Sequence, residues 1–180
     1  REELPDPFET FDGETVDSPE EWTERRRELQ QLFAHYIYGY TPDAPDIVTD
    51  VDRAAGVVDG QATLTEVTIE CVGLPADAPA ITLALFTPTG TGSDSVPVVL
   101  ALNRFGNHTV VADDAVTIPP AAREHGGDER GMSSDGWQID RVLDRGYGFA
   151  TFHSADIDPD RNDFTDGIHP HYDPPGPPGT

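Results

Sequence analysis

The chain has 180 residues, of which 34 are acidic and 11 basic, so its formal net charge is −23 at pH 7. A surface this negative repels nucleic acid and anionic lipid, which excludes both as partners, and no run approaches the ~18 apolar residues of a membrane helix. The apolar fraction of 36% is low for a globular protein but too high for a disordered one, so we expect one soluble domain with a core.

The first 17 residues are rich in turn formers and are expected to form an extended N-terminal segment before a helix. Ser18 can cap that helix, Pro19 suits its first position, and Glu21 completes a capping box. Gly39 is expected to end it. The apolar stripe consists of Trp22, Leu29, Leu32, Phe33 and Tyr36. The opposite face is interpreted as solvated and carries Glu24, Arg25, Arg26 and Glu28.

Two β-strands are predicted after the helix. Residues 63–71 alternate between apolar and polar side chains, and residues 81–87 are apolar on both sides. A turn sequence at residues 77–79 separates them, so we expect a hairpin. The single cysteine, Cys71, can form no internal disulfide and is interpreted as a small buried side chain.

A βαβ unit is predicted from the next three segments. Residues 96–102 form a continuous apolar run, typical of a strand buried on both faces. Ser134 or the residue after it can cap a helix that Gly146 closes, and residues 147–153 form a second apolar strand parallel to the first. The apolar residues of that helix are Trp137, Ile139, Val142 and Leu143. The proline-rich tail at residues 173–180 precludes regular structure.

The loop after residue 102 is the first candidate site, because open α/β sheets place their ligands at the C-terminal ends of their strands. Its candidate residues, for substrate contact or for an oxyanion-binding loop, are Asn103, Arg104, Phe105, Gly106, Asn107 and His108. A loop in this place can offer backbone N–H groups to an oxyanion. The alternative is an ordinary turn in which Asn and Gly serve the backbone.

Two further segments invite a metal-site interpretation. The weak cation candidates are Asp156, Asp158 and Asp160. An EF-hand is excluded, because its sixth loop position would be Arg161 instead of Gly and its twelfth Gly167 instead of Glu. The alternative to a looser cation site is an acidic loop whose side chains cap turns. His169 and His171 could bind zinc, but no third ligand follows from their spacing, so no metal is assigned.

No catalytic residue can be named. Ester hydrolysis on an α/β sheet needs a serine on a strand-to-helix turn, within Gly-x-Ser-x-Gly, and this motif does not occur in the sequence. The nearest segment, residues 131–136, precedes a predicted helix but follows no predicted strand. Ser154 directly follows His153, and adjacent residues of a strand point to opposite faces.

Four stretches in order resemble the glucuronoyl esterase-like α/β-hydrolases, a carbohydrate esterase family that also attracts acetyl-xylan-esterase labels. They are Leu4-Pro5-Asp6-Pro7-Phe8; Ser18-Pro19-Glu20-Glu21-Trp22 with Arg25-Arg26 and Tyr38-Gly39; Leu102-Asn103 with Gly106-Asn107-His108-Thr109-Val110; and Arg145-Gly146-Tyr147-Gly148 with Asp156-Ile157-Asp158-Pro159-Asp160 and Gly167-Ile168-His169-Pro170. The resemblance implies a three-layer αβα fold and a Ser-acid-His mechanism without a cofactor. It also implies that the nucleophile turn, the acid and the His lie C-terminal to the matched stretches.

The expected fold class is therefore α/β: the N-terminal portion of an α/β-hydrolase sheet, in which a helix and antiparallel strands lead into a βαβ unit. The expected function is the N-terminal portion of a serine esterase that acts on carbohydrate-linked esters and is inactive alone. The alternative is a non-catalytic hydrolase-like binding or structural domain. We expect residues 1–180 to form a single, incomplete domain whose strand at residues 147–153 lacks its next neighbour. Self-association or a complementing C-terminal half would then cover the exposed sheet.

Salt adaptation is the expected meaning of the charge. All 11 basic residues are Arg, Lys is absent, and the acids are scattered between apolar segments. At molar salt the Debye length is ~3 Å, so repulsion between surface carboxylates is screened. The composition therefore predicts a protein from a high-salt organism, and it leaves the cellular compartment open.

Overall fold

The computed structural model describes residues 4–41, 43–90, 95–119, 122–125, 127, 129–163 and 165–171. The chain divides into two compact units, with the boundary between Ala44 and Pro45. Within the described ranges, no helix combines the length and the apolar character that crossing a membrane requires. The proline-rich tail predicted at residues 173–180 lies outside the described residues.

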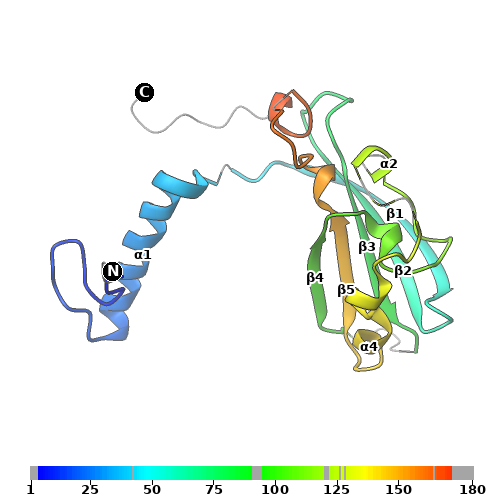
Figure 1. The fold of residues 1–180 in the computed structure, drawn as a ribbon, viewed down its shortest axis with the longest axis horizontal. Coiled ribbons are helices and arrows are strands. Elements are labelled where there is room, and N and C mark those ends of the chain that lie inside the picture. Colours follow the sequence, from blue (N-terminus) through cyan, green and yellow to red (C-terminus); the bar gives the residue numbers. More distant parts are fainter. Residues whose placement is uncertain are drawn as a thin grey trace. The chain divides into compact units, whose positions relative to one another are not determined.

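The first unit contains the predicted capped helix, α1 (Pro19–Phe33), drawn in blue in Figure 1. The Ser18 hydroxyl accepts a hydrogen bond from the Glu21 N–H at 3.2 Å, and the Glu21 carboxylate accepts one from the Asp17 N–H at 3.0 Å. These two bonds confirm the capping box, except that the Glu21 carboxylate accepts from the N–H of Asp17 instead of the N–H of Ser18. A π-helical turn, Ala34–Tyr38, extends α1, and Gly39 ends it with a φ of 75°.

Arg25 corrects the interpretation of the charged face of α1. Its side chain is only 4% exposed, whereas the sequence predicted a solvated position. The guanidinium lies over the Phe11 ring, 4.6 Å from its centroid, and donates to the Pro7 carbonyl at 3.2 Å and to Glu28 at 2.9 Å. The turn-rich segment before the helix therefore folds back onto α1 and covers this residue, which helical periodicity alone does not reveal.

The second unit is built on one mixed sheet of five strands. The strands are β1 (Ile47–Val57), β2 (Ala62–Cys71), β3 (Ile81–Pro88), β4 (Val98–Asn103) and β5 (Gly148–His153), in the spatial order β1-β2-β3-β5-β4. β2 and β3 form the predicted antiparallel hairpin, and β4 and β5 are the predicted parallel neighbours. An antiparallel pairing of β3 with β5 joins the two parts, which confirms the expected α/β fold class.

The outermost strand, β1, was not predicted from the sequence. It carries Thr49, Asp50, Asp52 and Arg53 among its apolar residues, and most of its residues are exposed. It pairs with β2 along its whole length. An edge strand needs apolar side chains on part of one face only, so its sequence pattern is weak.

The strand β4 corrects two expectations. Its apolar run suggested burial on both faces, yet β4 is the last strand at one end of the sheet, and Leu100 and Leu102 are 63% and 59% exposed. The buried strand is β5, which is an interior strand that pairs with β3 on one side and β4 on the other. β4 therefore lies at one edge of the described sheet, as β1 does at the other, and the expectation that the strand at residues 147–153 lacks a neighbour is wrong.

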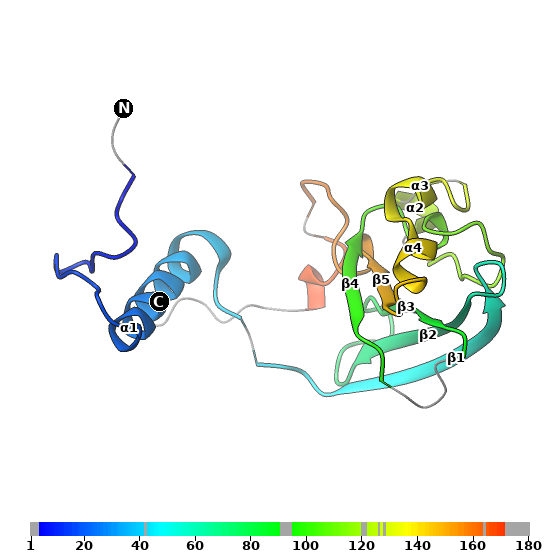
Figure 2. The ribbon, with the colours of Figure 1, turned by 90° about the horizontal axis from the view of Figure 1, so that it is seen from below.

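The helices of the second unit lie together on one side of the sheet (Figure 2). They are α2 (Ala122–His125), α3 (Ser134–Trp137) and α4 (Ile139–Leu143). The single helix predicted from Ser134 onward is thus two short helices, because Gln138 adopts a left-handed conformation, with φ 48° and ψ 49°, between them. Trp137 reaches the Phe149 ring at a centroid distance of 5.6 Å, so the predicted cover of β5 is present.

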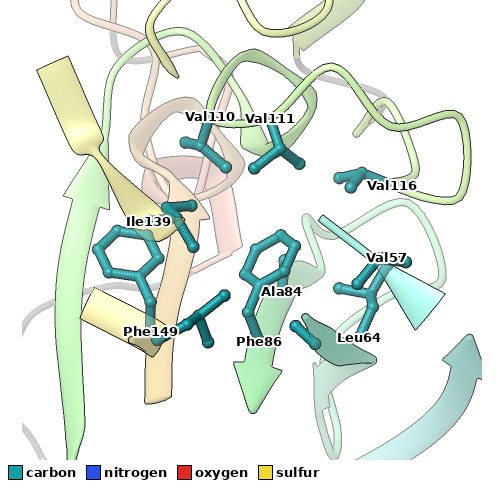
Figure 3. Packing of buried hydrophobic residues seen from close by; sticks show 11 residues of the cluster. Val57, Leu64, Ala84, Phe86, Val110, Val111, Val116, Ile139 and Phe149 are labelled. Atoms are coloured by element: carbon teal, nitrogen blue, oxygen red, sulfur yellow. The ribbon is translucent and has the colours of Figure 1, made fainter. Parts of the chain in front are cut away.

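The core lies between these helices and the sheet, as Figure 3 shows. Its buried members include Leu64, Phe86, Val110, Ile139, Leu143 and Phe149. Side chains alternate along a strand, so the residues beside Leu64, Phe86 and Phe149 point to the opposite face. That face carries Val67, Ile69, Leu83, Leu85, Val98, Leu100 and Leu102. We call it the second sheet face. None of α2, α3 and α4 lies on it.

Candidate functional site

The candidate site lies at the carboxyl edge of the sheet, which is the side where the C-terminal ends of β4 and β5 lie. The two strands are parallel, and their last residues, Asn103 and His153, are partners in the register. Their carboxyl ends therefore meet at one edge, and the loops that follow lie side by side. The loop after β4 contains a 3-10 turn, Asn107–Thr109, and the loop after β5 contains another, Ser154–Asp156.

Two buried side chains hold the peptide group between Arg104 and Phe105. Asn103 accepts a hydrogen bond from the Phe105 N–H through Oδ1 at 2.8 Å and donates through Nδ2 to the Gly106 carbonyl at 2.9 Å. His153 Nε2 lies 2.9 Å from the Arg104 carbonyl oxygen. A carbonyl oxygen can only accept, so Nε2 carries the proton.

Gly106 and His108 fix the middle of the loop. Gly106 has a φ of 98°, and a Cβ at this position would lie 2.7 Å from the Ala122 Cβ and 2.9 Å from His108 Cε1. Only glycine fits such a conformation and such close packing. His108 is buried, and its Nε2 lies 2.8 Å from the Gly127 carbonyl oxygen. The Thr109 hydroxyl adds a bond to the Gly106 carbonyl at 2.8 Å.

A second set of bonds ties the loop to β3. Asn107 Nδ2 donates to the Thr82 carbonyl at 2.7 Å, and the Thr82 N–H donates to Asp156 Oδ2 at 3.1 Å. Asp156 is only 4% exposed, and its Oδ1 lies 3.8 Å from His153 Nδ1. Burial raises the pKa of the Asp156 carboxyl from 3.8 to about 6, while the Thr82 N–H opposes part of that shift.

The six predicted loop residues divide into two groups. Asn103, Gly106, Asn107 and His108 point inward and are buried, whereas Arg104 and Phe105 are exposed. The Arg104 guanidinium lies 3.3 Å from the Asp160 carboxylate, at a small cavity of about 150 Å³ that also reaches Ser154. The outward pair therefore offers a cation and an aromatic ring on a loop whose backbone is held from within.

Part of the predicted oxyanion function conflicts with these bonds. The Phe105 N–H donates to Asn103 Oδ1, the Thr109 N–H to the Gly106 carbonyl, and the Val110 N–H to the Asn107 carbonyl. Those three donors are therefore occupied. The role of the loop in binding a substrate or an oxyanion stays a prediction.

The weak cation candidates are held by different partners. Asp156 binds the Thr82 N–H, Asp160 pairs with Arg104, and Asp158 Oδ2 lies 3.5 Å from His169 Nε2. Within the described ranges, no group of three or more His, Cys, Asp or Glu side chains is arranged to hold a metal ion. We therefore derive no metal chemistry from these residues.

The serines near the candidate site lack the setting of a nucleophile elbow. Ser134 begins α3 and follows a series of turns instead of a strand, as the sequence indicated. Ser154 begins the short 3-10 turn directly after β5 and lines the small cavity beside Arg104.

Sequence reasoning missed three contributors to the site: Thr82, the inward orientation of His153, and the burial of Asp156. Thr82 and Asn107 are 25 positions apart, and Arg104 and His153 are 49 apart. Pairing across that distance leaves no periodic signal. One indication was available, because Asn103 directly follows the apolar run at residues 96–102 and His153 is the last residue of the run at residues 147–153, and these two runs were predicted to be parallel neighbours.

Comparison with known sequences identifies esterases. No protein-family model matches the chain. A carbohydrate esterase from an unknown prokaryotic organism is 37% identical over 185 residues, which cover 94% of this chain and 42% of the relative. A 4-O-methyl-glucuronoyl methylesterase from Phanerochaete carnosa is 32% identical over 101 residues, 56% of this chain and 23% of the relative.

Solved structures give the same result. A promiscuous CE15 esterase from a marine bacterial metagenome superposes with a TM-score of 0.79 at 34% identity, covering 96% of this chain and 46% of that one. A glucuronoyl esterase from Solibacter usitatus superposes with a TM-score of 0.87 at 29% identity, covering 98% and 47%. The expected resemblance to glucuronoyl esterase-like carbohydrate esterases is thus confirmed, and the chain spans less than half the length of these relatives.

Proposed function

We propose that this chain, similar over almost its whole length to carbohydrate esterases, supplies the N-terminal part of a serine hydrolase that acts on carbohydrate-linked esters. The observation that carries the proposal is the similarity itself: 37% identity across 94% of the chain to a carbohydrate esterase. The α/β sheet and its match to two glucuronoyl esterase-like structures support it. In this proposal residues 1–180 form one part of a single α/β-hydrolase domain.

The chemistry of the complete enzyme would follow the serine esterase scheme. The serine hydroxyl attacks the ester carbonyl, a histidine takes the proton and returns it to the leaving alcohol, and N–H donors hold the oxyanion. This chain would supply the sheet and the loop at residues 103–108, which lies at the carboxyl edge where such sheets place their ligands. The nucleophile, the acid and the histidine would come from the complementing part.

The complementing part has a natural place to bind. β4 ends the sheet with an open edge, and the second sheet face presents exposed apolar side chains, including Leu100 and Leu102. An unpaired edge offers backbone N–H and C=O groups to a further strand. Burying apolar area contributes about 25 cal/mol per Å², so covering the second sheet face would stabilise the complex. A strand added beside β4 would also lie next to the loop at residues 103–108.

The test is complementation. The chain would be co-expressed with the unmatched C-terminal part of the prokaryotic carbohydrate esterase, and hydrolysis of a glucuronic acid methyl ester would be measured. We expect activity from the pair, saturation with substrate, and inhibition by a serine-directed phosphonate. The chain alone should hydrolyse p-nitrophenyl acetate no faster than a denatured control. Saturable hydrolysis by the chain alone, blocked by the phosphonate, would refute the proposed division of the site.

A second candidate is a non-catalytic domain that binds a carbohydrate or a protein partner. The 180 residues contain no Gly-x-Ser-x-Gly turn, and they span less than half the length of the carbohydrate esterase that they match. The two candidates differ in what the coding sequence contains. A downstream reading frame that encodes such a turn supports the esterase, and a stop without one supports the binding domain.

A further inference from the structure

The peptide group between Arg104 and Phe105 is bonded at both of its polar ends. Its carbonyl oxygen accepts from His153 Nε2 at 2.9 Å, and its N–H donates to Asn103 Oδ1 at 2.8 Å. The two side chains come from the last residues of β4 and β5, which are partners in the parallel register. Each end of this one peptide plane is therefore fixed by a different strand.

Burial strengthens these two hydrogen bonds. Asn103 is 1% exposed and His153 is fully buried, so water does not compete for their polar atoms. A buried polar group left unpaired costs about 1–3 kcal/mol, which penalises any rotation of the peptide. Asn103 must both accept and donate, because its Nδ2 also binds the Gly106 carbonyl. Aspartate lacks the donor and leucine lacks both groups.

The far end of the loop has a matching support. Both polar groups of the Thr82 backbone are used: its carbonyl accepts from Asn107 Nδ2 and its N–H donates to Asp156 Oδ2. Asp156 in turn faces His153 across 3.8 Å. The loop is thus connected to β3 at Asn107 and to β5 at Arg104, so its backbone is held on both sides of Gly106.

We infer that Asn103 and His153 are positioning residues of the proposed ester site. By fixing the Arg104–Phe105 peptide, they set the direction in which the Arg104 guanidinium and the Phe105 ring project from the carboxyl edge of the sheet. Those two side chains are exposed although their backbone is held, so they can meet a substrate without first ordering the loop. The placement of a substrate at these side chains rests on the proposed function, whereas the fixed Arg104–Phe105 peptide rests only on its own hydrogen bonds.

The first measurement needs no substitution. The nitrogen chemical shifts of the His153 ring, recorded on the labelled 180-residue chain at molar salt, report which ring nitrogen carries a proton. We expect a protonated Nε2, because the Arg104 carbonyl can only accept. A ring protonated on Nδ1 alone would overturn the inference.

The second measurement compares two variants at His153. His153→Gln keeps an amide N–H near the position of Nε2, and His153→Leu has a similar volume without a donor. Amide hydrogen exchange at Phe105 should become on the order of tenfold faster in His153→Leu and return to within about threefold of the unmodified chain in His153→Gln. Equal acceleration in both variants, or none in either, would contradict the inference.

Two variants at Asn103 provide an independent test if His153→Leu does not fold. Asn103→Asp keeps the acceptor for the Phe105 N–H, and Asn103→Leu removes it. Protection at Phe105 should survive the first change and be lost in the second, while amides in the β2–β3 hairpin serve as an internal reference. Loss of protection at Phe105 in Asn103→Asp, with the hairpin amides unchanged, would contradict the assigned bond.

The complemented enzyme separates this inference from the proposed function. There, His153→Leu should reduce kcat/KM at least tenfold and His153→Gln should restore most of it, without a change in the pH profile. If the unmodified complemented enzyme shows no esterase activity, the proposed function is wrong, and the fixed peptide is still judged by exchange at Phe105. If activity is present and both variants match the unmodified enzyme, the positioning role is wrong.

Discussion

Buried polar side chains define the carboxyl edge of the sheet at the scale of single residues. Asn103, Asn107, His108 and His153 are all buried, and each bonds to a backbone carbonyl in a loop or at a strand end. Buried polar groups are stable only when hydrogen-bonded, so each of these side chains constrains a segment of chain. Asp156 differs, because it is a buried carboxyl and burial disfavours its charged form.

The raised pKa of Asp156 predicts an unusual pH dependence. Burial raises it from 3.8 to about 6, so the folded protein holds this proton more tightly than the unfolded chain does. The stability contribution of the carboxyl is therefore present at low pH and is lost as pH rises from about 4 to about 6, by up to about 3 kcal/mol. Asp156→Asn, which keeps an acceptor for the Thr82 N–H, should remove that loss.

Urea unfolding at constant molar salt between pH 4 and 7 tests this prediction. Relative to the unmodified chain, Asp156→Asn should gain stability as pH rises. Asp163→Asn is the matched control, because Asp163 is exposed and bonds from Thr165 lower its pKa. Its contribution is present above the ordinary pKa of 3.8 and is lost only as pH falls below that value, so between pH 4 and 7 the control should stay nearly parallel to the unmodified chain. Parallel pH profiles for Asp156→Asn and the unmodified chain would refute the assignment.

At the scale of elements, the junction between α3 and α4 places the helical layer over β5. Gln138 ends α3 and begins α4 in a left-handed conformation, and the break sets Trp137 and Ile139 on the core. A non-glycine residue in this conformation costs roughly 1–2 kcal/mol. The packing of Ile139 and Phe149 in the core offsets that cost.

Gln138→Gly should therefore stabilise the second unit. Glycine reaches the left-handed conformation without strain, and after its larger loss of backbone entropy on folding the net gain should be about 0.5–1 kcal/mol. The bond from Arg141 to the Gln138 side chain is exposed and contributes little. Gln138→Ala is the matched control, since it removes the same bond but keeps the strain. Equal unfolding midpoints for the two variants would contradict the strain at this position.

At the scale of the whole molecule, the −23 charge predicts a strong dependence on salt. In dilute buffer the carboxylates repel one another, and at molar salt the Debye length falls to ~3 Å and screens that repulsion. The melting temperature, followed by circular dichroism, should rise steadily from dilute buffer to molar KCl or NaCl. A melting temperature that is independent of salt would refute the proposed salt adaptation.

The open edge of β4 and the second sheet face predict association. Unpaired strand edges and exposed apolar faces favour pairing with another chain, so we expect the chain to associate with itself or with a complementing C-terminal part. Light scattering at molar salt over a dilution series should show a mass above that of a monomer. Leu100→Lys, on the exposed face of β4, should shift the equilibrium towards monomer, whereas Met132→Lys, at an exposed residue just before α3 on the helical side of the sheet (Figure 2), should not. A monomeric unmodified chain with cooperative unfolding would contradict this prediction.

Features that depend on neighbours along the chain could be predicted from the sequence. The cap at Ser18, the β2–β3 hairpin and the parallel pairing of β4 with β5 all follow from local patterns: capping residues, alternation and continuous apolar runs. The resemblance to carbohydrate esterases also follows from the order of short motifs, and the comparisons confirm it.

The identity of the interior strand and the pairing of distant polar residues depend on long-range contacts. β4 and β5 are both short apolar runs. Apolar content predicts that a strand is buried, but it does not predict which element of the structure covers it. β5 is covered because β3 pairs with it, and β4 is left at the edge. Arg25, Thr82 and Asp156 are placed by contacts across 18 to 74 positions of sequence, and such contacts depend on the assembled sheet and loops, which leave no periodic trace.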